Sequence, residues 1–120
     1  MNQELLKIIK DAEKNKVAIG HFNISNLEQL KAISHVARRL NVPVIIGTSE
    51  GEREYLGLHH SVDLIRSYNK EHAGNGYGMF LNADHTYSLE KVKQAAEVGY
   101  DAIVFDGSKL PFEENVKQTK

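Results

Sequence analysis

Apolar positions along the chain follow two alternating spacings. Several stretches carry apolar residues three or four positions apart, the spacing of a helix with one buried face, over residues 3–13, 27–40, 62–68 and 88–99. Short apolar runs without alternation, typical of strands covered on both faces, occupy residues 17–20, 43–47, 79–81 and 102–105. The order predicts about four strand–helix units and a parallel sheet.

Polar and glycine-rich segments mark where these elements begin and end. Ser25 and Glu28 have the spacing of a capping box at the start of the second helix. Ser88 is predicted to cap the start of the helix that follows it, and Gly99 to end that helix. Residues 48–54 are predicted to form a polar loop, and residues 72–78 a glycine-rich loop.

Two architectures accommodate alternating strands and helices: an open doubly wound sheet and the (β/α)₈ barrel. A barrel needs roughly 250 residues, and this chain has 120. A last helix begins at Pro111, and it reaches residue 120 without a closing glycine or a completed apolar stripe. We therefore expect residues 1–120 to be the N-terminal half of a barrel domain, covering about the first four βα units and truncated at its C-terminus.

Composition narrows the class of protein. A net charge of −1 argues against binding nucleic acid through a basic surface. No apolar run reaches the ~18 residues that a membrane span needs. The absence of cysteine removes disulfides and thiolate metal ligands. We expect a cytoplasmic globular protein without nucleic-acid or membrane partners.

Chemically active side chains follow every predicted strand. They are Asn23, Ser49, the pair Asp84 and His85, and Asp106. Because the carboxyl ends of parallel strands converge on one face, we expect these side chains to lie together. No predicted strand contains a lysine, which disfavours Schiff-base chemistry and favours a metal-dependent route.

The pair Asp84–His85 is the strongest candidate. Imidazole is a common zinc ligand, and a carboxylate beside the metal can exchange a proton with a substrate hydroxyl. Simpler roles remain open: Asp84 as a helix cap, Asp106 as a turn residue before glycine, and Ser49 as part of a turn rather than a phosphate site.

Four segments together resemble the class II, metal-dependent fructose-bisphosphate aldolases and the related tagatose- and ketose-bisphosphate aldolases. They are residues 20–23 (GHFN), 43–51 (PVIIGTSEG), 81–86 (LNADHT) and 105–115 (FDGSKLPFEEN). The resemblance runs over nearly the whole chain, in order, and residues 81–86 are its most specific part.

The resemblance implies a homo-oligomeric (β/α)₈ barrel of glycolysis and gluconeogenesis. It implies reversible cleavage of a ketose 1,6-bisphosphate to dihydroxyacetone phosphate and glyceraldehyde 3-phosphate, with fructose or tagatose as the sugar. The implied cofactor is Zn²⁺, with a second metal or a monovalent cation alongside it. Residue by residue, it makes Asp84 the proton donor and acceptor at the C4 hydroxyl, His85 a zinc ligand, Asp106 a ligand of the second metal position, and Asn23 and Ser49 substrate-binding residues.

The remaining zinc ligands of that family lie in the second half of its barrel, so we expect the 120-residue chain to be inactive alone. One alternative is a non-catalytic half-barrel that assembles with a partner through its unpaired sheet edges. A weaker alternative is an open flavodoxin-like sheet that binds a phosphate-bearing ligand.

Overall fold

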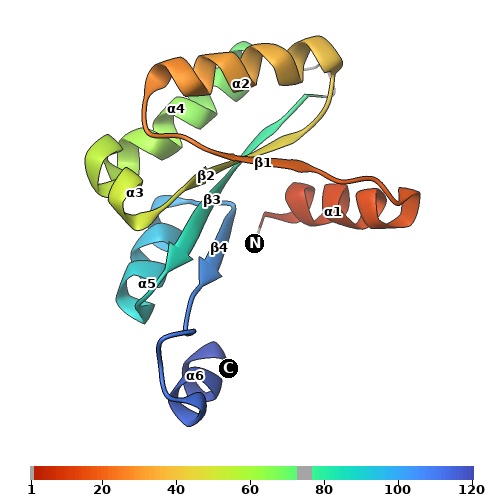
Figure 1. Cartoon of the computed structure of the whole chain (residues 1–120). Helices are drawn as coiled ribbons and strands as arrows, with labels where there is room; N and C mark the ends of the chain where they lie inside the picture. The colour runs from red at the N-terminus through yellow and green to blue at the C-terminus, as the bar shows by residue number, and fades with distance from the viewer. Residues whose placement is uncertain (1, 73–76) are drawn as a thin grey trace.

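The chain forms a parallel sheet with helices between successive strands, in a computed structural model that describes residues 2–72 and 77–120 (Figure 1). Within those residues the sheet has four strands: β1 (Gly20–Asn23), β2 (Val44–Thr48), β3 (Met79–Thr86) and β4 (Ala102–Phe105). Their spatial order is β1-β2-β3-β4, and every neighbouring pair is parallel. A flavodoxin-like sheet has its second strand at the edge and its first inside. The sequential order therefore fits the (β/α)₈ barrel and excludes that alternative.

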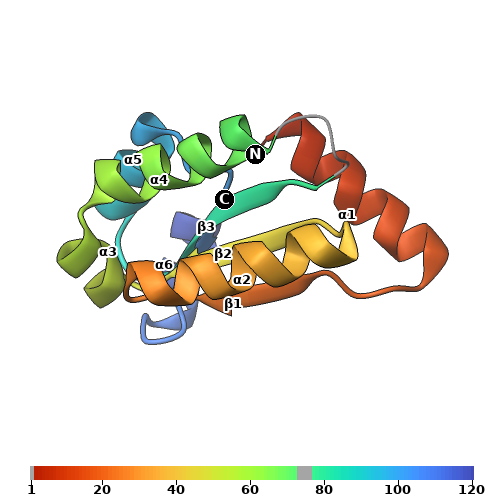
Figure 2. The same cartoon turned by 90° about the horizontal axis from the view of Figure 1, so that it is seen from above.

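Six helices accompany these strands in the described part of the chain. They are α1 (Gln3–Asn15), α2 (Leu27–Leu40), α3 (Glu50–Leu56), α4 (Leu58–Glu71), α5 (Leu89–Val98) and α6 (Phe112–Thr119). The view from above shows α2 and α4 alongside the strands, with α1 at one end of the sheet (Figure 2). No helix of the described residues has the length and apolar character that crossing a membrane requires.

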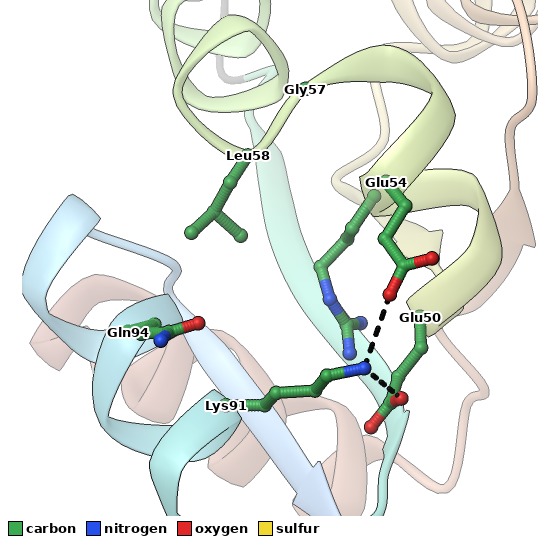
Figure 3. Close-up of a pocket in the computed structure, with 7 residues that line it drawn as sticks. Glu50, Glu54, Gly57, Leu58, Lys91 and Gln94 are labelled. Carbon is green, nitrogen blue, oxygen red and sulfur yellow. Dashed lines mark hydrogen bonds and ion pairs between the residues drawn. The ribbon is translucent and has the colours of Figure 1, made fainter.

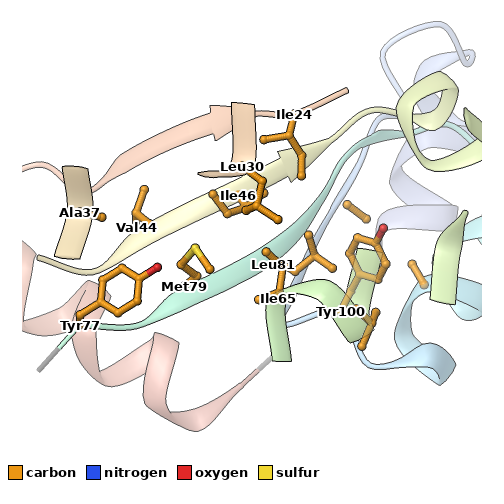
Figure 4. Packing of buried hydrophobic residues seen from close by; sticks show 13 residues of the cluster. Ile24, Leu30, Ala37, Val44, Ile46, Ile65, Tyr77, Met79, Leu81 and Tyr100 are labelled. Carbon is orange, nitrogen blue, oxygen red and sulfur yellow. The ribbon is translucent and has the colours of Figure 1, made fainter. Parts of the chain in front are cut away.

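The main core lies between the sheet and the helices that follow its strands. Leu30 of α2, Ile46 of β2, Ile65 of α4 and Leu81 of β3 are buried together there (Figure 4). Burying one such side chain contributes about 1.5–3 kcal/mol to folding. Burial on this helix-covered side therefore stabilises the sheet that carries the residues of the opposite side.

The opposite side of the sheet, here called the inner face, carries the intervening residues of the strands. Side chains alternate between the two faces, and the register places His21 beside Ile45 and Asn23 beside Gly47. Asn82 of β3 pairs in register with Gly47 and shares that face. In a barrel this face lines the packed interior, and its residues nearest the carboxyl ends of the strands border the active site.

The first and third strands differ from their predicted bounds. Strand β1 begins at Gly20 rather than Val17, whose side chain is exposed. Strand β3 continues to Thr86 because the polar residues after Leu81 keep pairing with β4. Hydrophobicity alone underestimates the length of such a strand, because the residues at its polar end lie at the site.

Two boundary predictions were wrong. Residues 48–54 are not a loop: β2 ends at Thr48 and α3 begins at Glu50. Helix α2 is capped by Asn26, whose side chain accepts from the Gln29 amide, and not by Ser25. The predicted glycine-rich loop falls largely on residues 73–76, which lie outside the described residues.

Helix α1 is attached to the end of the sheet where the strands begin. The Asn2 side-chain nitrogen donates to Asp101 Oδ1 at 2.7 Å, and the Asn2 amide donates to the Asp101 carbonyl at 3.1 Å. The other Asp101 oxygen accepts from the Leu81 amide at 2.8 Å. One carboxylate thus joins α1, β3 and the start of β4.

Candidate active site

The end of β3 carries the central pair of the site in an unusual backbone conformation. The pairing of β3 with β4 shifts register between Ala83 and Thr86, which places Asp84 and His85 in a bulge. His85 has a φ of 41°, in the left-handed region. For a residue with a side chain this costs about 1–3 kcal/mol and is found most often at functional sites.

A buried arginine holds this bulge in place. Arg53 of α3 is 6% exposed, and its guanidinium donates to the carbonyls of Thr48 and Asp84 and to the Thr86 hydroxyl. The contact with Asp84 O is 3.2 Å and that with Thr86 Oγ1 is 3.0 Å. Arg53 therefore fixes the ends of β2 and β3 relative to each other. Arg53 was not predicted from the sequence, because residues 48–54 were expected to form a loop.

Asn23 binds the predicted catalytic carboxylate directly. Its side-chain nitrogen lies 3.2 Å from Asp84 Oδ2 and 3.1 Å from Glu52 Oε2. The structure thus brings Asn23 and Asp84 together across the ends of β1 and β3. It adds Glu52, a second carboxylate that the sequence analysis did not single out.

Ser49 is engaged in capping α3. Its hydroxyl accepts from the Glu52 amide at 3.4 Å, and its own amide donates to Glu52 Oε2 at 2.7 Å. Burial raises the pKa of Glu52, but hydrogen bonds from Ser49, Ser25 and Asn23 bring that pKa below its ordinary value overall. Ser49 therefore contacts an ionised Glu52, and Glu52 in turn contacts Asn23.

His85 and Asp106 form the second pair of the site. His85 Nδ1 lies 2.8 Å from Asp106 Oδ2, and the Ser108 amide donates to Asp106 Oδ1 at 2.9 Å. Hydrogen bonds from Ser108, and then from His85, lower the pKa of Asp106 to about 2. An ionised carboxylate only accepts, so His85 Nδ1 is the donor. The pKa of His85 is raised by that hydrogen bond and by the charge of Asp84.

This geometry limits how His85 and Asp106 can hold a cation. With Nδ1 turned to a carboxylate, Nε2 is the ring nitrogen left for a metal, as in many histidine sites. Asp106 orients His85 through Oδ2, and each Asp106 oxygen accepts one hydrogen bond, which leaves a lone pair on each for a cation. Among the described residues no group of three or more potential metal ligands comes together. A catalytic zinc has about three protein ligands, so the nitrogen and oxygen donors here fit part of such a site.

Three further side chains surround these pairs. The Tyr87 ring stacks on His85 with centroids 6.5 Å apart, and Lys109 Nζ lies 5.0 Å from the centre of the Tyr87 ring. On the inner face, His21 Nε2 lies 3.0 Å from the Asn82 side-chain nitrogen. His21 therefore packs under the site, beside Asn82 of β3. It reaches β3 across β2 because residue 47 is glycine: a Cβ there would collide with His21 and Asn23.

A pocket beside the site has a structural role. Lys91 of α5 donates to Glu50 at 2.6 Å and to Glu54 at 3.1 Å, joining α5 to α3 (Figure 3). Glu50 also accepts from the Tyr87 amide at 2.8 Å. This network fixes the segment that follows His85, while the predicted site residues lie outside the pocket.

The parallel sheet has its strands in the order of a (β/α)₈ barrel, and its carboxylates and imidazole lie at the carboxyl ends of the strands, where barrels of this class carry their active sites. The sequence model of the family "Fructose-bisphosphate aldolase class-II" matches residues 3–120. The chain belongs to this family, which confirms the resemblance and the fold predicted from the sequence.

Two of the curated relatives that match the chain are named as aldolases. Over 115 residues the chain is 36% identical to a fructose-bisphosphate aldolase of Staphylococcus aureus, covering 95% of this chain and 40% of the relative. It is 35% identical to a 6-phospho-5-dehydro-2-deoxy-D-gluconate aldolase of Shouchella clausii, covering 94% of this chain and 39% of the relative. The chain thus spans about 40% of the length of these curated relatives.

Solved structures show the same fold. The YdjI aldolase of Escherichia coli K12 superposes with a TM-score of 0.83 at 26% identity, covering 99% of this chain and 45% of that one. A putative fructose-1,6-biphosphate aldolase of Coccidioides immitis superposes with a TM-score of 0.79 at 27% identity, covering 95% and 44%.

Proposed function

We propose that the chain supplies the first half of the active site for metal-dependent aldol cleavage and condensation of a phosphorylated ketose. Fructose 1,6-bisphosphate and tagatose 1,6-bisphosphate are the first candidates. The observation that supports this most is the juxtaposition of Asp84 with Asn23 and of His85 with Asp106 at one end of a barrel-ordered sheet. Residues 1–120 then form the N-terminal half of the barrel domain.

Asp84 is the proposed proton acceptor in cleavage. Removing a proton from the C4 hydroxyl of the sugar starts the break of the C3–C4 bond. Asn23 donates to Asp84 Oδ2 and leaves Oδ1 for the substrate. The Arg53 contact to the Asp84 carbonyl keeps the carboxylate at the mouth of the barrel while the proton moves.

His85 is the proposed metal ligand through Nε2, with Asp106 turning the ring. A bound divalent cation stabilises the negative charge that develops on the ketone-side fragment. Zn²⁺ suits the imidazole, and a second metal or a monovalent cation beside Asp106 stays a prediction. Ser49 is proposed to act on the substrate indirectly, through Glu52.

The experiment joins this chain to the remaining part of the S. aureus aldolase, beyond its matched segment, and measures cleavage of both bisphosphates with Zn²⁺. We expect turnover that a chelator abolishes. Asp84→Asn should lower kcat by about 10²–10⁴-fold while Zn²⁺ affinity changes little. His85→Ala should weaken Zn²⁺ binding itself, measured by titration calorimetry.

Two results would contradict this proposal. One is a folded, metal-loaded chimera in which Asp84→Asn cleaves sugar as fast as the parent. The other is chelator-sensitive turnover by residues 1–120 alone, because half of a site should not suffice. The proposal also includes three properties of the whole protein. Its partners are small sugar phosphates, it is a homo-oligomer, and it acts in cytoplasmic carbohydrate metabolism.

A further inference from the structure

Glu52 is a carboxylate at the mouth of the site to which the proposed reaction assigns only an indirect part, through its contact with Ser49. The Asn23 side-chain nitrogen lies within 3.2 Å of both Glu52 Oε2 and Asp84 Oδ2, so one amide bridges the two carboxylates. Glu52 therefore lines the same space as Asp84, on the side formed by the ends of β1 and β2.

Glu52 also takes up the hydrogen-bond donors on that side. The Ser25 hydroxyl donates to Oε1 at 3.0 Å, and the Ser49 amide donates to Oε2 at 2.7 Å. With Asn23, three donors from the segments that follow β1 and β2 converge on a single carboxylate. An anion arriving from solution would need these same donors.

The consequence for a ligand follows from charge. A phosphate placed beside Glu52 and Asp84 faces two like charges at short range. A sugar hydroxyl placed there donates to a carboxylate oxygen instead. Discrimination between ligands comes as much from such repulsion as from attraction.

We propose that Glu52 is a specificity-determining residue, which makes the β1–β2 side of the site accept the neutral, hydroxyl-bearing end of a sugar and exclude a phosphate. This inference rests on the proposed aldol reaction and changes its preferred substrate. That substrate becomes a ketose monophosphate, and the fructose and tagatose bisphosphates named first above become the poorer substrates.

The direct test is a titration of the chimera with inorganic phosphate, followed by NMR at the Ser49 amide and the Asn23 side-chain amide. Glu52→Gln is the main variant because glutamine also serves in a capping box. We expect it to bind phosphate at least tenfold more tightly than the parent chimera at these two signals. Glu52→Ala is a second variant with the same expectation, in case glutamine perturbs the fold.

Glu54→Gln is the matched control. It removes one negative charge from the same helix, but Glu54 pairs with Lys91 in the neighbouring pocket. Its phosphate affinity should equal that of the parent. If the parent binds phosphate at Ser49 as tightly as Glu52→Gln does, or if Glu54→Gln produces the same gain, the inference is overturned.

A kinetic comparison separates this inference from the proposed function. In the chimera, fructose 1-phosphate should have a higher kcat/KM than fructose 1,6-bisphosphate, and Glu52→Gln should shift that ratio at least tenfold toward the bisphosphate. A ratio that Glu52→Gln leaves unchanged counts against Glu52. Absence of turnover with either sugar in every variant counts against the proposed function, while the phosphate titration still decides the role of Glu52.

Discussion

At the scale of single residues, the buried Arg53 holds the ends of two strands together beneath the site. Arg53 places a charge in a buried position and contacts three neutral oxygens on β2 and β3. Buried charges persist where hydrogen bonds compensate their desolvation. The left-handed backbone of His85 depends on this compensation, because Arg53 binds the carbonyl of the preceding residue.

Replacing this arginine should destabilise the chain. Arg53→Met fills a similar volume but leaves the Thr48 and Asp84 carbonyls and the Thr86 hydroxyl without their donor, so we expect a loss of about 2–4 kcal/mol in the free energy of unfolding. Arg53→Lys keeps the charge without the planar fork, and its loss should be smaller. Urea unfolding measures both, and a loss below about 0.5 kcal/mol for Arg53→Met would contradict this role.

The candidate site was partly predictable at this scale. Asn23, Asp84, His85 and Asp106 were found because polar residues after buried strands converge on one face, and the structure joins them in two pairs. Arg53 and Glu52 were not found because residues 48–54 were predicted to form a loop and most of their partners lie 27 to 33 positions away in sequence. The one local signal was the capping-box spacing from Ser49 to Glu52, which was overlooked.

At the scale of elements, most helices and strands follow from periodicity, and the errors lie where function intervenes. Strand β4 was predicted with its observed bounds, residues 102–105, and α5 follows the predicted Ser88 cap. Helix α3 was missed because it is short and polar, and its stability comes from Arg53 and the Glu50–Lys91 pair rather than from an apolar stripe.

Two glycines in different backbone conformations should respond oppositely to alanine. Gly51 lies within α3 and an added Cβ meets nothing within 4 Å, so Gly51→Ala should stabilise the chain by about 0.5–1 kcal/mol. Gly99 ends α5 with a φ of 98°, and a Cβ there meets the guanidinium of Arg66. Gly99→Ala should destabilise by about 1 kcal/mol or more. Thermal melts of the pair check the sign, and equal effects would contradict the structural assignment.

Lowering the pH should destabilise helix α3 before it destabilises the sheet. Burial raises the pKa of Glu50, but the Lys91 and Tyr87 hydrogen bonds lower it below its ordinary 4.5 overall. A carboxyl with a lowered folded-state pKa contributes stability that is fully present above its unfolded-state pKa and is lost as pH falls through the folded value. Urea unfolding at pH 7, 5, 4 and 3 should therefore show a decline that begins near 4.5. Glu50→Gln should have a shallower decline, and an identical slope would remove Glu50 as a contributor.

At the scale of the whole molecule, the described sheet has two edges. Strands β1 and β4 each pair with one neighbour in that part of the chain. Phe22 on β1 and Val104 on β4 are 51% and 43% exposed. Edges of this kind attract further strands, and a barrel removes them by closing.

We therefore expect residues 1–120 alone to self-associate at micromolar concentration, as measured by sedimentation velocity. Phe22→Lys should reduce association because it places a charge on the β1 edge. Tyr55→Lys is the control, since Tyr55 is 81% exposed on α3. A folded monomer of the parent chain at these concentrations would show that the edges do not drive assembly.

The carboxylate of Asp101 has a consequence for the order of events during synthesis. Its bond to Asn2 spans 99 positions, whereas β1, β2 and β3 pair with one another over shorter separations. A ribosome releases the chain from its N-terminal end, so α1 emerges before the strands and remains without its anchor until the start of β4 has been made. Helix α1 should thus dock after β1, β2 and β3 have paired.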